Sequence, residues 1–197
     1  MVEPKWLSGR VSVSKQEAAH VFIEGDDYLV CKKYAFHRWS NQKKGPWGSG
    51  ILNSEDDERR TERLGLIGEM AFAKLTGLPV DVEEHQFGDQ YDFMVRDVTM
   101  DIKLSSNGNH GVGFLKIRDN DVVIPLKCRV YIFGVCTLDD RERERAGTLI
   151  LGYQTREWIE LNAVEAPGRA GDWTNLEIPF NQLIPIRDLI EQIKNVV

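Results

Sequence analysis

The run RVYIFGVCTL at residues 129–138 constrains the fold more than any other part of the chain. Apolar side chains occupy both its odd and its even positions, so as a strand it presents apolar groups to both faces of a sheet. Such a strand lies inside a layered domain, with other elements covering the sheet on each side. Strand-like runs surround it at 80–82, 91–95, 100–104, 114–118 and 148–154. Because helical patterns flank these strands, the sequence predicts an α/β or α+β domain.

A long helix is predicted over residues 55–76. Its apolar residues recur at helical spacing, at Leu64, Ile67, Ala71 and Leu75. Ser54 and Asp57 resemble a capping box at its start, and Gly77 ends it. The chain ends in a second amphipathic pattern at 183–197, which predicts another helix.

Two short strands joined by a turn at 96–99 are predicted to form a hairpin. In its second strand Asp101 and Lys103 alternate with Ile102, so they share one face. A turn of this length places Asp92 opposite Lys103, with both acids and the amine within about 5–8 Å of one another. Two carboxylates at that range repel unless a cation lies between them or one is protonated. Oxygen ligands of this kind favour a hard divalent metal such as Mg²⁺.

Glu69 is a third carboxylate with unusual neighbours. The residues three and four positions away on the helix are small or apolar: Gly65, Leu66, Phe72 and Ala73. A glutamate in this setting is either partly buried or directed at a site. Gly65 and Gly68 are expected to let the helix approach the sheet closely, at some cost in helix propensity. The simpler alternative is that Glu69 is solvated or paired with Arg63.

This order of features, a glutamate in a glycine-containing helix, then Asp, then Asp-x-Lys on a hairpin, resembles the PD-(D/E)xK nuclease superfamily. The segments that carry the resemblance are LGLIGE at 64–69, GDQYDFMV at 88–95 and MDIKLS at 100–105. Tyr91 stands where the family name has proline, which many members lack. The resemblance implies a restriction-endonuclease-like α/β fold, with a mixed central β-sheet flanked by helices. We expect this nuclease-like domain over 53–197, with an N-terminal arm over 1–52 that contacts nucleic acid.

From the resemblance, Asp92 and Asp101 would hold Mg²⁺, with Mn²⁺ as a substitute and the Ile102 carbonyl as a further ligand. Glu69 would assist through a second metal or a bound water, and Lys103 would orient or deprotonate the attacking water. The implied reaction is endonucleolytic hydrolysis of DNA phosphodiester bonds, which leaves a 5′-phosphate and a 3′-hydroxyl. A metal and a lysine suit this chemistry, because negative charge builds up on the phosphoryl oxygens.

Other interpretations of the same residues remain open. The hairpin acids and the lysine also fit a surface salt bridge of little energetic value. Asp89 is an alternative metal ligand, and His110 is either an exposed loop residue or a catalytic helper. An inactive nucleic-acid-binding module of the same fold is the main rival function. A nuclease for RNA or branched DNA is the second, because substrate class depends on loops.

The segment 28–50 combines basic and aromatic residues and contains no acidic residue. Basic side chains bind phosphates, and exposed aromatic rings stack on bases. The predicted nucleic-acid contacts are Lys32, Lys33, Arg38, Lys43 and Lys44, together with Ser105, which follows the Asp-x-Lys strand at 100–104. The alternative is that the rings pack on the domain and the lysines are solvated.

Charge and cysteine usage limit the remaining classes of protein. The net charge of −6 excludes a wholly basic coat protein for nucleic acid, although it allows a local basic surface. No apolar run approaches the roughly 20 residues of a membrane span, and the N-terminus lacks a secretory signal. Cys31, Cys128 and Cys136 form no CxxC pair, which favours reduced thiols and a cytoplasmic protein. The resemblance to these nucleases also implies a homodimer, because two sites are needed to cut two strands.

Overall fold

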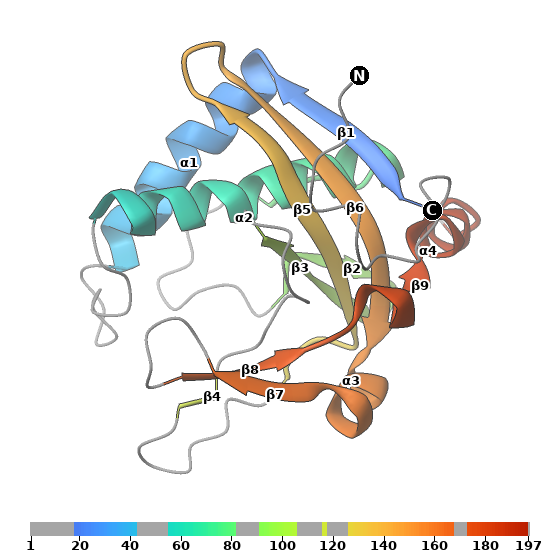
Figure 1. Cartoon of the computed structure of the whole chain (residues 1–197). Helices are drawn as coiled ribbons and strands as arrows, with labels where there is room; N and C mark the ends of the chain where they lie inside the picture. Colours follow the sequence, from blue (N-terminus) through green and yellow to red (C-terminus); the bar gives the residue numbers. More distant parts are fainter. Residues whose placement is uncertain are drawn as a thin grey trace.

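A computed structural model describes residues 18–42, 55–81, 91–105, 116–117, 126–167 and 173–196 of the chain. Its centre is a mixed, curled β-sheet (Figure 1). The strand order is β1 (Ala19–Glu24), β6 (Arg145–Thr155), β5 (Val130–Asp140), β3 (Val98–Ser105) and β2 (Phe93–Val95), and β9 (Ile184–Pro185) also pairs with β6. Strands β3 and β5 are parallel, whereas the other neighbours are antiparallel. The prediction of an α/β domain whose mixed sheet is flanked by helices is confirmed.

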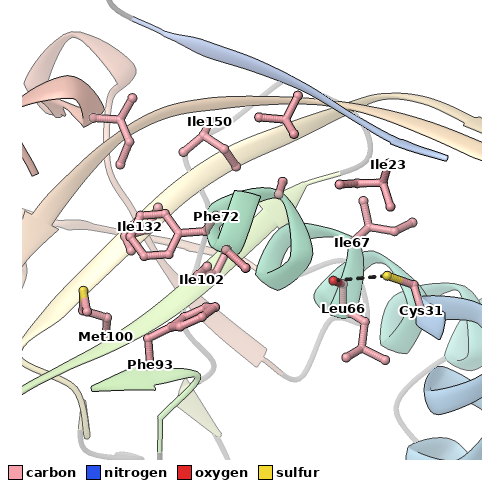
Figure 2. Close-up of a cluster of buried hydrophobic side chains, with 14 of the residues drawn as sticks. Ile23, Cys31, Leu66, Ile67, Phe72, Phe93, Met100, Ile102, Ile132 and Ile150 are labelled. Atoms are coloured by element: carbon pink, nitrogen blue, oxygen red, sulfur yellow. Dashed lines mark hydrogen bonds between the residues drawn. The ribbon is translucent and has the colours of Figure 1, made fainter. Parts of the chain in front are cut away.

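Strand β5 is buried on both faces from Val130 to Cys136, as its apolar sequence predicts. Three helices lie on one face: α1 (Asp26–Gln42), α2 (Glu55–Thr76) and α4 (Ile186–Lys194). Figure 2 shows the core between these helices and the sheet, which includes Ile23, Ile67, Phe72, Met100, Ile102, Ile132 and Ile150. Helix α2 has the bounds that the sequence predicts, and the proposed capping residue Ser54 lies outside the described residues.

Helix α2 approaches strand β3 closely at one glycine. A Cβ on Gly68 would lie 3.0 Å from Ile102 Cγ2 and 3.4 Å from the Leu104 Cβ, so only glycine fits there without a shift. A Cβ on Gly65 would meet nothing within 4 Å. The expectation that both glycines thin the helix is therefore wrong for Gly65, because that residue does not face the sheet.

The opposite face of the sheet packs on a second, smaller core. It contains Tyr131, Phe133, Val135, Leu151, Ile159 and Ile178. Ile159 belongs to α3 (Arg156–Asn162), whose first turn is capped where the Trp158 N–H donates to Thr155 Oγ1 at 3.3 Å. A second, three-stranded antiparallel sheet has the order β4 (Lys116–Ile117), β8 (Trp173–Glu177) and β7 (Val164–Pro167). The sequence predicted β4 but neither β7 nor β8.

Two terminal predictions need correction. Residues 18–42 are not an arm, because β1 pairs with β6 along its whole length and α1 packs on α2. Tyr28, Cys31 and Ala35 of α1 are buried in the main core. The C-terminal helix begins at Ile186 rather than at 183, since the preceding residues form β9.

All three cysteines are free and buried, as predicted. Within the described ranges, no helix is long and apolar enough to cross a membrane.

Candidate active site

The β2–β3 hairpin sets the relative positions of the two predicted metal-binding aspartates. Its turn is only two residues long, with Arg96 at a φ of 54°, and it pairs Val95 with Val98. The predicted register, with a turn at 96–99 and Asp92 opposite Lys103, is therefore wrong by two residues. A shift of two keeps every side chain on its expected face, since side chains alternate with a period of two. It places Asp92 beside Asp101 instead, at the point where pairing between the strands ends.

Asp92 is anchored at this point by backbone contacts. Its own N–H donates to the Met100 carbonyl at 2.9 Å, and the Ile102 N–H donates to Asp92 Oδ2 at 2.6 Å. The carboxylate therefore accepts a hydrogen bond that a strand carbonyl accepts where a ladder continues. The Ile102 carbonyl points to the same side of β3 as its N–H, toward Asp92, because both groups of one residue face the same neighbour.

Asp101 and Lys103 lie together on the face of β3 away from α2. Lys103 Nζ is 2.7 Å from Asp101 Oδ2, and both side chains keep some exposure to solvent. Their neighbours Met100 and Ile102 point into the main core, which confirms the predicted alternation. Burial alone would lower the pKa of Lys103, but the charges of Asp101 and Asp92 and the hydrogen bond to Asp101 outweigh it and raise the pKa. The amine therefore stays protonated.

Glu69 projects from α2 and is buried, with 4% of its surface exposed. Arg38 of α1 binds it with both guanidinium nitrogens, NH1 to Oε1 at 2.7 Å and NH2 to Oε2 at 3.3 Å. Arg38 NH2 also donates to the Asp81 carbonyl at 3.2 Å. The alternative pairing of Glu69 with Arg63 is wrong, because Arg63 bonds Asp139 at 2.6 Å elsewhere on the helix.

Glu69 and Asp101 both act electrostatically on Asp92. Burial, together with the negative charges of Glu69 and Asp101, raises the pKa of Asp92 to about 8. The hydrogen bond from Ile102 and the charge of Lys103 oppose this rise without cancelling it. A bound proton or a divalent cation would relieve this repulsion on Asp92.

The donor set fits Mg²⁺. It consists of oxygen atoms only, from Asp92, Asp101 and the Ile102 carbonyl, and Mg²⁺ is commonly held by one or two carboxylates with waters in its remaining positions. Within the described part of the chain, no group of three or more His, Cys, Asp or Glu side chains is placed so that it could hold a metal ion. A magnesium ion held by two carboxylates and a carbonyl does not require such a group.

The predicted nucleic-acid contacts are dispersed. Lys32 and Lys33 are exposed on α1, with the Lys33 Nζ 5.5 Å from the centre of the Tyr34 ring. Arg38 is engaged with Glu69, and Ser105 ends β3. Four further candidates lie outside the described residues: Lys43, Lys44, Asp89 and His110.

Sequence reasoning missed two neighbours of the cluster. It assigned Arg38 to a DNA-binding arm, whereas the residue holds Glu69. It treated Cys128 as an ordinary core thiol, whereas burial and the charges of Asp101 and Asp92 together raise the pKa of that thiol to about 11. The absence of acidic residues between 28 and 50 is a weak signal for the first, because an unmatched arginine on a packed helix needs a partner elsewhere.

Comparisons with family models, with curated proteins and with solved structures give no match to this chain. What the cluster does has to be inferred from its own residues.

Proposed function

We propose that the protein is a metal-dependent nuclease that hydrolyses DNA phosphodiester bonds. One observation carries the proposal: Asp92, Asp101 and Lys103 meet at the end of the β2–β3 pairing, and the two acids repel each other there. Two repelling carboxylates beside a protonated amine suit a divalent cation and an anionic substrate at the same place.

In this proposal the residues have separate tasks. Asp92 and Asp101 hold Mg²⁺ or Mn²⁺ with the Ile102 carbonyl, and Glu69 contributes charge from α2. When bound, the ion stabilises negative charge on the phosphoryl group and favours ionisation of water. Lys103 acts on a phosphoryl oxygen or on the attacking water, and its contact with Asp101 orients the amine.

The finer assignments belong to the same proposal. A restriction-endonuclease-like fold is supported by the order of the glutamate helix, the Asp hairpin and the Asp-x-Lys strand, and by the parallel pairing of β3 with β5. We further propose endonucleolytic cleavage of DNA that leaves a 5′-phosphate and a 3′-hydroxyl, and a homodimer with one site for each strand. A cytoplasmic location is supported by three buried, free thiols.

An inactive nucleic-acid-binding module of the same fold is the second candidate. Two ion pairs favour it, because Glu69 is bonded by Arg38 and Asp101 by Lys103. In an inactive protein these pairs would be permanent and would replace the metal.

The test is nicking of supercoiled plasmid in Mg²⁺ and in Mn²⁺ by the wild type, Lys103→Ala and Asp97→Asn. Asp97 is a matched control, because it lies in the turn of the same hairpin and forms an exposed ion pair with Arg129 at 2.9 Å. We expect nicking by the wild type and by Asp97→Asn, and its loss in Lys103→Ala. DNA binding without nicking in either metal would support the inactive module.

A panel of single-stranded, duplex, flap and four-way DNA, with RNA beside them, then identifies the substrate class. Preferential cleavage of RNA or of branched DNA would replace duplex DNA as the proposed substrate.

A further inference from the structure

The Arg38–Glu69 contact joins two elements that lie far apart in the sequence. Arg38 is on α1 and Glu69 is on α2, and the guanidinium binds both oxygens of the carboxylate. The side chains are 18% and 5% exposed, so solvent screens the pair little. The further bond from Arg38 to the Asp81 carbonyl fixes the direction of the guanidinium. Planar, two-point contacts of this kind are the strongest that arginine makes.

This contact neutralises Glu69, one of the three carboxylates of the cluster. Asp92 interacts electrostatically with Glu69, with Asp101 and with Lys103. Among the described residues that interact here, three carboxylates, when ionised, meet the two cations Arg38 and Lys103, which leaves one net negative charge. One divalent cation makes the cluster positive by one charge, which a phosphodiester then neutralises. A second divalent cation would leave an excess of positive charge inside a partly buried site.

We propose that Arg38 takes the place of a second metal ion: its guanidinium neutralises Glu69, so the site holds a single divalent cation on Asp92 and Asp101. This inference rests on the proposed function and specifies its metal stoichiometry. Arg38 is then a positioning residue that acts through Glu69 and does not contact the substrate. The chain supplies with an arginine the charge that a second ion would supply in a two-metal site.

The experiment is a Mn²⁺ titration of the full chain without substrate, in which free Mn²⁺ is followed by electron paramagnetic resonance. We expect the wild type to bind one Mn²⁺. Arg38→Lys keeps the charge and should also bind one. Arg38→Gln leaves Glu69 without its cation, and should bind a second ion or bind the first at least about tenfold more tightly.

The decisive variant is Arg38→Gln combined with Glu69→Gln. It has the same net charge as the wild type and keeps Asp92, Asp101 and Lys103 intact. We expect it to bind one Mn²⁺ with an affinity within about threefold of the wild type, because neither removed group is a metal ligand. A tenfold or larger loss would show that Glu69 is itself a ligand, and would overturn the inference.

A structural control separates ion binding from packing. Arg63→Gln breaks the other buried ion pair of α2, so it should lower the melting temperature without changing the number of bound ions. If Arg38→Gln only lowers the melting temperature and binds Mn²⁺ as the wild type does, then Arg38 is merely structural and the inference is wrong.

The number of Mn²⁺ ions bound by the wild type separates the single-ion inference from the nuclease proposal. Two bound Mn²⁺ ions, with nicking intact, would overturn the single-ion inference and leave the nuclease proposal standing. No bound Mn²⁺, with no nicking, would remove the proposed function and the inference with it.

Discussion

Helix α2 carries two buried ion pairs, at Arg63 and at Glu69, and they differ in how completely their charges are balanced. Arg63 donates to one oxygen of Asp139 at 2.6 Å, and the Tyr28 hydroxyl donates to the other at 2.9 Å. Burial alone would raise the pKa of Asp139, but these two hydrogen bonds and the charge of Arg63 hold it below its usual value. Burial and the bond to Asp139 raise the pKa of Tyr28 to about 12, so it stays a donor.

Further along α2, around Glu69, the negative charge on Asp92 is not fully offset. Arg38 satisfies Glu69, yet Asp92 beside it remains under repulsion from two carboxylates. The Arg63 pair joins α2 to β5 and to α1 and satisfies both oxygens of Asp139, as expected of a contact that serves stability, although Arg63 Nε is buried without a hydrogen-bond partner among the described residues. The Glu69 pair borders a surplus of negative charge, as expected of a site that binds a cation. Substitutions at the two ion pairs should therefore affect different properties of the protein.

The largest effect is expected from Asp92→Asn. The amide oxygen still accepts the Ile102 N–H, but the negative charge that holds the metal is lost. If Asp92 holds a metal as proposed, plasmid nicking should fall by at least about 10²-fold. The melting temperature should stay the same or rise, because repulsion within the cluster is relieved. A melting temperature that falls together with activity would show that Asp92 is a structural residue. The surroundings of Glu69 would then serve stability, as the Arg63–Asp139 pair does.

Arg63→Met is expected to have the opposite outcome. It leaves Asp139 buried without its cation, so the free energy of unfolding should fall by about 3 kcal/mol. Denaturant unfolding followed by circular dichroism measures this change. Nicking by the folded fraction should stay within about twofold of the wild type, since Arg63 is not part of the cluster. Arg63→Met combined with Asp139→Leu should recover part of the stability.

The pH dependence of stability should also distinguish the Arg63–Asp139 pair from the cluster around Glu69. The pKa of Asp139 is lower in the folded protein than the unfolded value of about 3.9, so the ionised carboxylate contributes stability above that pH. This contribution should be lost as the pH falls through the lower, folded pKa. The stability difference between the wild type and Asp139→Asn should therefore be constant near neutral pH and shrink below about pH 4. A difference that persists unchanged into acid would refute the assignment.

The sequence predicts the parts of this arrangement that depend on local periodicity. The bounds of α2, the two-sided burial of β5 and the alternation of Asp101 with Ile102 all follow from spacing along the chain. The spacing of apolar residues can be recognised within a single segment, because it does not depend on which other segment packs against it.

The sequence does not predict the parts that depend on long-range contacts. Strand β1 lacks a clear pattern because it lies at the edge of the sheet, and its pairing with β6 spans more than a hundred residues. The hairpin register depends on one backbone angle at Arg96, a residue type that seldom adopts positive φ. The partner of Glu69 is on a helix 31 residues earlier, where no local pattern indicates it. The charges around each ion pair therefore become apparent only in the three-dimensional structure.

The smallest effects are expected at the two glycines between the ion pairs. Gly65→Ala meets open space, so it should raise the free energy of unfolding by about 0.5–1 kcal/mol through helix propensity. Gly68→Ala places a methyl group 3.0 Å from Ile102 Cγ2, so α2 must move away from β3, at a cost of about 1 kcal/mol or more. Because Gly68 faces β3, the strand that carries Asp101, Gly68→Ala should also weaken Mn²⁺ binding, whereas Gly65→Ala should not. Equal effects of the two substitutions on metal binding would mean that the spacing between helix and hairpin does not tune the site.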